Sequence, residues 1–189
     1  MSIPTRVRLI DVGPRDGLQN EKQPVPAAVK IELVRRLQAA GLREIEVTSY
    51  VSPKWVPQMG DNSAVMAAIQ RQAGVRYSVL TPNLKGFEGA LASKADEVVI
   101  FAAASEAFSQ RNINCSIAES IERFRPVVDA AHANGIKVRA AVSCALGCPY
   151  EGEVSPATVN DVVRQLLDIG MDDLPALFKS YGVEAPFDL

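Results

Sequence analysis

The chain has 189 residues, of which 48% are hydrophobic, and its 20 basic and 22 acidic residues leave a formal charge of -2. Because neither charge forms a long block, the composition excludes the usual footprint of a nucleic-acid or anionic-membrane binder and favours a small-molecule partner. An odd count of three cysteines argues against a secreted disulfide framework.

Short β-rich segments alternate with segments of helical periodicity along the whole chain. We expect strands at 7–12, 44–49, 76–81, 97–102 and 137–143, and helices at 26–41, 62–74, 83–95, 116–135 and 155–170. Five consecutive strand–helix pairs predict a parallel sheet. No dinucleotide-type glycine-rich turn follows the first strand, so the pattern favours an α/β fold of the (β/α)8 TIM-barrel type.

The number of strand–helix pairs is smaller than a closed barrel needs. Eight pairs take about 250 residues. We therefore expect a partial barrel of about five βα units over residues 1–171 and a divergent tail over 172–189. No apolar run approaches the roughly 18 residues of a membrane span, and the first expected strand begins too early for a targeting segment, which predicts a cytoplasmic protein.

Polar residues collect where the expected strands end. Arg15 and Asp16 follow the first strand, Glu46 lies in the second, Asn83 follows the third and Cys144 follows the fifth. In a parallel barrel the carboxyl ends of the strands share one rim, and that rim holds the ligand. The sequence therefore predicts a site at this rim.

The residue types at this rim fit two interpretations. A carboxylate such as Asp16 suits a hard divalent cation, and the Arg15 guanidinium suits an enolate or thioester oxygen. The same Arg-Asp pair also fits a glycine-flanked turn with a local ion pair. Glu46 lies between two apolar residues, so its carboxylate must be paired or must face a polar interior.

Three other residues of interest have a structural explanation. Cys144 and Cys148 form a C-x3-C pair with no histidine or further cysteine nearby, which fits buried packing better than a zinc site. His132 is the only histidine, and charge complementarity with a helix C-terminus accounts for it.

Five long motifs carry a family resemblance. They are DVGPRDGLQNEKQPV, IEVTSYVSPKWVPQMGD, VLTPNLKGFEGAL, EVVIFAAASEAFSQRNINCSI and VSCALGCPYEGEVSP. Together they resemble the hydroxymethylglutaryl-CoA lyases, which belong to a metal-dependent barrel group that also includes isopropylmalate and homocitrate synthases. The resemblance runs from about residue 7 to residue 171.

The resemblance implies retro-Claisen cleavage of 3-hydroxy-3-methylglutaryl-CoA to acetoacetate and acetyl-CoA, a step of leucine breakdown and ketone-body formation. It assigns Arg15 to the enolate and thioester oxygen, Asp16 to a divalent cation (Mg2+ or Mn2+), and Glu46 to support of catalysis. Three further residues of the loop are offered as contacts to the acyl or CoA group: Gln19, Asn20 and Lys22.

The chain also departs from the family pattern. The family completes its cation site with an H-x-H pair and uses a cysteine in a late glycine-rich loop, whereas this chain has only His132. The ALGCPY segment follows the fifth expected strand and corresponds to an earlier, non-catalytic segment. We therefore expect any divalent cation to bind weakly if at all.

Three interpretations stay open. The first is a lyase-family polypeptide, incomplete after about residue 171, with little or no activity alone. The second is a non-catalytic half-barrel that binds an acyl-CoA or a partner, and the third is a Claisen-condensing or aldolase relative. The expected partner is a small-molecule acyl-CoA, with no nucleic acid and no membrane, and self-association into a homo-oligomer is left open.

Overall fold

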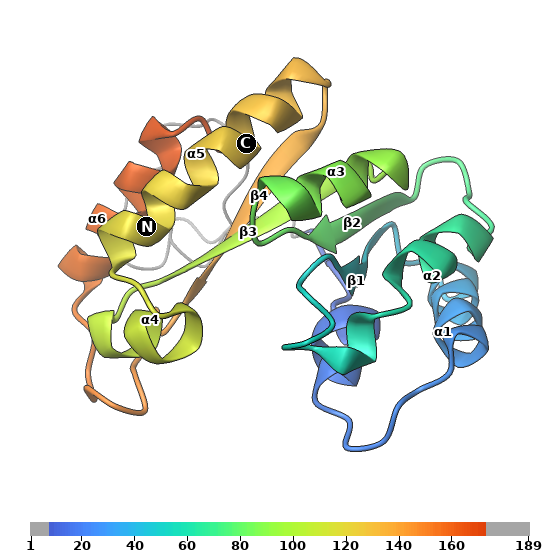
Figure 1. The fold of residues 1–189 in the computed structure, drawn as a ribbon, viewed down its shortest axis with the longest axis horizontal. Helices are drawn as coiled ribbons and strands as arrows, with labels where there is room; N and C mark the ends of the chain where they lie inside the picture. The colour runs from blue at the N-terminus through green and yellow to red at the C-terminus, as the bar shows by residue number, and fades with distance from the viewer. Residues whose placement is uncertain (1–7, 173–189) are drawn as a thin grey trace. The chain divides into compact units, whose positions relative to one another are not determined.

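The computed structural model describes residues 8–172 and contains a four-stranded sheet (Figure 1). The strands follow one another in sequence order, and the first pair is parallel. This sequential parallel arrangement confirms the predicted α/β fold. The strands are β1 (Glu44–Ser49), β2 (Arg76–Leu80), β3 (Glu97–Ala103) and β4 (Lys137–Ser143).

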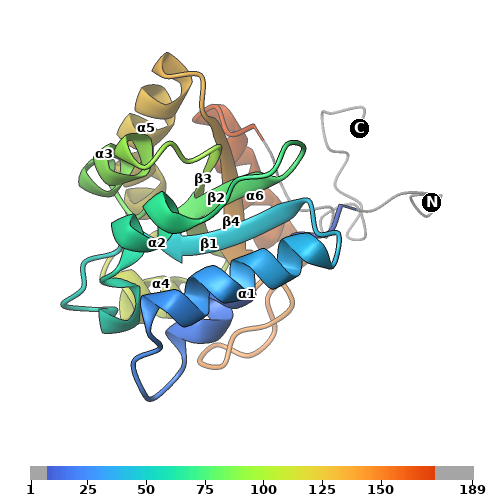
Figure 2. The same cartoon turned by 90° about the vertical axis from the view of Figure 1, so that its right-hand side faces the viewer.

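The chain divides into two compact units, with the boundary between Val98 and Val99. Among its described residues, 8–98, the first unit contains β1, β2 and three α-helices, with α1 running alongside β1 (Figure 2). Its core is made of residues that are at most 1% exposed, including Val34, Ile45 and Val79. Its helices and helical turns are η1 (Gly13–Gly17), α1 (Ala27–Ala39), η2 (Pro57–Met59), α2 (Asn62–Ala68) and α3 (Leu84–Ala92).

The predicted first strand is wrong for the described part of 7–12. Only Asp11 pairs with the sheet, through an isolated parallel bridge to Ile45. The Asp11 side chain accepts a hydrogen bond from the amide of Gly13 at 2.9 Å, and this contact turns the backbone into the helical turn that follows. Local side-chain capping therefore competes with strand pairing at this position.

Two helices of the first unit end earlier than predicted. Helix α2 ends at Ala68 rather than at 74, because Ile69 adopts an extended conformation with ψ of 136°. After the helix ends, a side chain satisfies the backbone instead: the side-chain amide of Gln38 donates a hydrogen bond to the backbone carbonyl of Gln70 at 2.9 Å. Helix α3 ends at Ala92, three residues before the predicted end.

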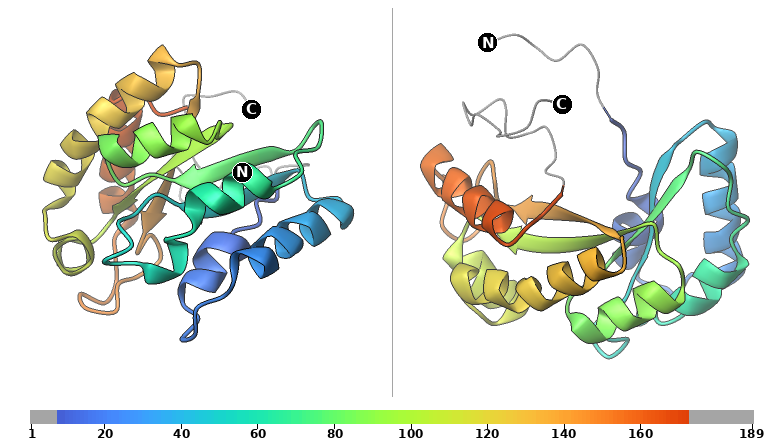
Figure 3. Two further views of the ribbon diagram at one scale, coloured as in Figure 1. Left: turned by 45° about the vertical axis from the view of Figure 1, so that its right-hand side comes forward. Right: turned by 90° about the horizontal axis from the view of Figure 1, so that it is seen from above.

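In the second unit, α5 packs alongside β4, and α4 and α6 both contact α5 (Figure 3). Phe101 of β3 meets Phe124 edge to face, with ring centroids 5.4 Å apart. A capping box between Ser116 and Glu119 starts the long α5 helix. The helices are α4 (Glu106–Ile113), α5 (Ile117–Ala133) and α6 (Pro156–Asp168), of which α4 was not predicted.

Two predictions concern the C-terminal tail and the absence of a membrane span. The predicted tail over 172–189 lies outside the described residues except for Asp172. Within 8–172, no helix combines the length and the hydropathy that a membrane crossing requires.

Candidate active site

The Arg-Asp segment folds into a single turn beside β1. The carbonyl oxygen of Val12 accepts hydrogen bonds from the amides of Arg15 (3.2 Å), Asp16 (2.7 Å) and Gly17 (3.3 Å), which gives the turn its π-helical character. Two backbone bonds anchor the residue before the turn: Asp11 donates to the carbonyl of Glu44 at 3.0 Å, and its own carbonyl accepts from the Glu46 amide at 2.8 Å. Such π turns occur frequently at functional sites.

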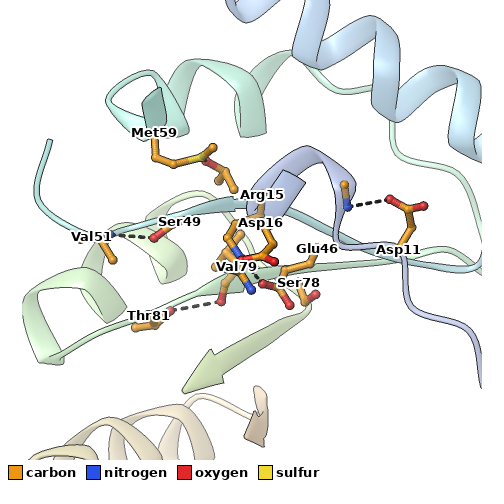
Figure 4. Close-up of polar contacts among 12 residues, drawn as sticks. Asp11, Arg15, Asp16, Glu46, Ser49, Val51, Met59, Ser78, Val79 and Thr81 are labelled. Carbon is orange, nitrogen blue, oxygen red and sulfur yellow. Dashed lines mark hydrogen bonds and ion pairs between the residues drawn. The ribbon is translucent and has the colours of Figure 1, made fainter. Parts of the chain in front are cut away.

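The turn brings three of the predicted site residues together (Figure 4). Arg15 Nε lies 2.5 Å from Glu46 Oε1, and one terminal nitrogen of Arg15 lies 2.6 Å from Asp16 Oδ1. Glu46 is only 1% exposed and Arg15 12%, whereas Asp16 is 54% exposed. The buried carboxylate therefore has the ionic partner that its burial demands.

This pairing fixes the orientation of the guanidinium. Glu46 is the third residue of β1 rather than its last, and it pairs with Ser78 directly before a register shift in the strand, so the sheet holds the carboxylate that binds Arg15. A guanidinium carries five N–H donors, and contacts to two carboxylates do not exhaust them. The arrangement can therefore present a fixed, permanently charged donor group to an anionic oxygen.

The other predicted site residues have different surroundings. Asn20 is exposed and donates from Nδ2 to the backbone carbonyl of Asp16 at 2.7 Å. Gln19 is half-buried and Lys22 is exposed. Asn83 accepts from the amide of Gly86 at 2.9 Å and so caps α3, which gives it a structural role.

The residues that hold the loop after the turn were not predicted from the sequence. The Gln58 side chain donates to the carbonyls of Glu21 (2.8 Å) and Gln23 (2.5 Å) and accepts from the amide of Val25 (3.0 Å). We call these three bonds the Gln58 clamp. Because the clamp grips the backbone on both sides of Lys22, it fixes the segment that carries a predicted substrate contact.

The buried ammonium group of Lys30 holds the backbone of Gln58 in place. The Lys30 side chain is 3% exposed, and its Nζ donates to the backbone carbonyl of Gln58 and to Asp61 Oδ1, the latter at 2.7 Å. The motif VPQMGD contains both Gln58 and Asp61, so its unusual composition was the available signal. The loop partners are 33 to 37 residues away from Gln58 in sequence, and nothing local identifies them.

The histidine and the cysteines lie outside this cluster. His132 Nε2 lies 2.9 Å from Asp172 Oδ2, in the last turn of α5. All three cysteines are free: Cys115 and Cys148 are buried, and Cys144 is half-buried. Over residues 8–172, no three side chains among histidine, cysteine, aspartate and glutamate converge as a metal site would require.

Strands that follow one another in sequence order in a parallel α/β sheet are typical of the TIM-barrel class of fold, and here a charged cluster lies beside the first of them. The HMGL-like family model matches residues 6–183, and the chain belongs to this family.

Proteins with similar sequences and structures support this family assignment. The 3-hydroxy-3-isohexenylglutaryl-CoA/hydroxy-methylglutaryl-CoA lyase of Pseudomonas aeruginosa is 60% identical over 170 residues, which cover 90% of this chain and 57% of that protein. The mitochondrial hydroxymethylglutaryl-CoA lyase of Rattus norvegicus is 56% identical over 185 residues, with 98% and 57% covered. A crystal structure of the hydroxymethylglutaryl-CoA lyase from Pseudomonas aeruginosa superposes with a TM-score of 0.89 at 59% identity, covering 92% of this chain and 58% of that one.

The comparisons confirm the family resemblance and the partial-barrel fold. The chain spans about 57% of the length of these lyases from Pseudomonas aeruginosa and Rattus norvegicus.

Proposed function

We propose that this chain carries the arginine and carboxylate part of a hydroxymethylglutaryl-CoA lyase site. The reaction is cleavage of 3-hydroxy-3-methylglutaryl-CoA to acetoacetate and acetyl-CoA, within leucine breakdown and ketone-body formation. The observation that carries the proposal is the 2.5 Å contact between Arg15 and the buried Glu46, in a chain 60% identical over 170 residues to a 3-hydroxy-3-isohexenylglutaryl-CoA/hydroxy-methylglutaryl-CoA lyase.

The chemistry explains why an oriented guanidinium is needed. A base takes the tertiary hydroxyl proton, the carbon–carbon bond breaks, and the acetyl-CoA part leaves as an enolate with its charge on the thioester oxygen. The enolate carbon then takes up a proton to give acetyl-CoA. A preorganised cation beside that oxygen stabilises the developing charge and pays no reorganisation cost at the moment of reaction. In this proposal Arg15 is the catalytic group, and Glu46 holds its orientation from β1.

The substrate contacts are proposed for the same loop. Gln19, Asn20 and Lys22 follow the Arg15 turn directly, and Lys22 supplies a positive charge suited to the acyl or phosphate groups of an acyl-CoA. The Gln58 clamp supports this assignment, because it holds the backbone of Glu21 and Gln23 and so limits the conformations open to Lys22.

A divalent cation, Mg2+ or Mn2+, is implied by the family, with Asp16 as its carboxylate ligand. Residues 8–172 do not fit a complete cation site: no three suitable ligands converge there, and Asp16 is already paired with Arg15 at 2.6 Å. We therefore derive no catalytic step through the cation. We propose weak binding at Asp16 and a cytoplasmic location, which the three free cysteines of the structure favour.

The test is an assay for acetoacetate from 3-hydroxy-3-methylglutaryl-CoA in the presence of Mg2+ or Mn2+. It compares the 189-residue chain with the same chain extended by the C-terminal segment of a full-length relative. The proposal expects acetoacetate from the extended chain and its loss on Arg15→Met. An extended, folded chain that binds acyl-CoA without cleaving it would favour the binding-protein interpretation instead.

A further inference from the structure

The loop after β4 brings two cysteines together in the second unit. Cys144 has a left-handed backbone with φ of 62°, directly after the strand ends at Ser143. Cys148 then forms an isolated antiparallel bridge with Gly152, in which its amide donates at 2.7 Å and its carbonyl accepts at 2.9 Å. These bonds close the loop and fix the position of the Cys148 side chain.

The sulfur of Cys148 is surrounded by hydrogen-bond donors. Ser105 Oγ donates to it at 2.9 Å, and the amide of Tyr150 donates at 3.4 Å. The backbone of Glu151 and the thiol of Cys144 also hydrogen-bond to it. Ser105 is the N-cap of α4, so the sulfur lies beside the positive end of a helix dipole. A sulfur that accepts from this many donors is arranged to carry a negative charge.

The two thiols ionise differently as a result. Burial raises the pKa of Cys144 to about 11, and its hydrogen bond to Cys148 acts in the same direction. Burial also opposes ionisation of Cys148, but the hydrogen bonds from Ser105 and from two backbone amides outweigh it and lower its pKa. Of the two hydrogen-bonded thiols, Cys148 is therefore the one that loses its proton more readily.

We propose that Cys144 and Cys148 form a redox-active dithiol, which hydroperoxides oxidise to an intrachain disulfide. This inference is independent of the lyase reaction, because neither cysteine belongs to the Arg15 cluster. Cys148 is the attacking residue, and Cys144, hydrogen-bonded to it through sulfur, is the resolving residue. Cys148 itself is 6% exposed, and the neighbouring loop residues Leu146 and Tyr150 are 73% and 49% exposed, so a small oxidant reaches the sulfur only through this loop.

The chemistry balances with hydrogen peroxide as the oxidant. The Cys148 thiolate attacks one peroxide oxygen, the oxygen–oxygen bond breaks, and hydroxide leaves and takes up a proton to form water. Cys144 then attacks the Cys148 sulfur, which forms the sulfur–sulfur bond and breaks the sulfur–oxygen bond. The second hydroxide leaves and takes up the Cys144 proton. Two thiols lose two electrons and two protons, and the peroxide becomes two waters.

Peroxide titration of the reduced 189-residue chain tests the proposal, with intact mass and peptide mapping as readouts. We expect a loss of two hydrogens and a linked Cys144–Cys148 peptide, reversed by dithiothreitol. Cys115 is the internal reference, because it is a third free thiol that is only 2% exposed. At neutral pH, Cys148 should react at least about tenfold faster than Cys115.

Serine variants separate the two roles. Cys144→Ser should stop at a Cys148 sulfenic acid, which dimedone captures, whereas Cys148→Ser should leave Cys144 unmodified under the same dose. Ser105→Ala should slow the reaction of Cys148 several-fold, since it removes one donor to the sulfur. A disulfide that involves Cys115, or a Cys148 that reacts no faster than Cys115 in wild type and in the folded Cys144→Ser protein, would overturn the proposal.

Discussion

Replacement of Gln58 by alanine tests how the loop beside the candidate active site is held. The side chain makes all three bonds of the Gln58 clamp, to the carbonyls of Glu21 and Gln23 and to the amide of Val25. Alanine keeps the backbone of the η2 turn and the carbonyl that Lys30 binds, because that contact uses the main chain. The change therefore removes the clamp and leaves its support in place.

The size of the effect follows from the three bonds. Each intramolecular hydrogen bond contributes a net 0.5–1.5 kcal/mol or so, and Gln58 is half-buried, so water replaces part of what is lost. We expect the free energy of unfolding to fall by about 1–2 kcal/mol, and the melting temperature by roughly 2–8 °C for a chain of this size. The local effect on the Val25 amide should be larger, because its acceptor disappears.

Hydrogen exchange measured at single amides reads this local effect directly. The Val25 amide should exchange at least about tenfold faster in Gln58→Ala, which corresponds to about 1.4 kcal/mol. The matched control is Gln165→Ala, an exposed glutamine of α6, which should change neither exchange at Val25 nor the melting temperature. Unchanged protection at Val25, with Gln58→Ala as stable as wild type, would show that the clamp does not hold the loop.

Three further predictions concern pH, packing and metal. Hydrogen bonds from Arg35 and then from Arg36 lower the pKa of Glu32 to about 2. In denaturation curves, Glu32→Gln should therefore lower the free energy of unfolding near neutral pH. This difference from wild type should disappear as the pH falls from about 4.5 to about 2. Gly86→Ala should lower the free energy of unfolding by about 1–3 kcal/mol in urea titrations, because the added Cβ would lie 2.9 Å from Pro82 Cδ and 3.1 Å from a backbone oxygen. Calorimetric titration with Mn2+ should detect only weak binding, since the Asp16 carboxylate is exposed and already paired; micromolar affinity that Asp16→Asn abolishes would contradict this.

The sequence predicted the regular core of the fold well. The segments 44–49, 76–81, 97–102 and 137–143 fall within one residue of β1 to β4, because short segments rich in β-branched, aromatic and other apolar residues between turns favour strands. The prediction of the first strand was wrong where the Asp11 side chain caps the turn that follows it. Helix α4 was missed because its sequence, EAFSQRNI, is mostly polar and depends on the Ser105 cap.

The candidate site was predictable only in part. The argument that strand ends share a rim placed Arg15 near Glu46, and the structure joins them although they are 31 residues apart. The same argument gave no hint of the Gln58 clamp or of the buried Lys30, since both depend on contacts between distant loops. Hydrophobic periodicity predicts which face of a helix or strand is buried. It does not predict which polar side chain from a distant loop will contact that helix or strand.

The most direct test of the central claim is the kcat/KM of Arg15→Met relative to wild type, measured as acetoacetate formation in the chain extended by a relative's C-terminal segment. If Arg15, held by Glu46, stabilises the enolate, the ratio should fall by about 100-fold to 1000-fold, the usual cost of removing a preorganised oxyanion donor. The melting temperature and circular dichroism of both proteins establish that the variant is folded. A folded Arg15→Met protein with kcat/KM within about threefold of wild type would contradict the account.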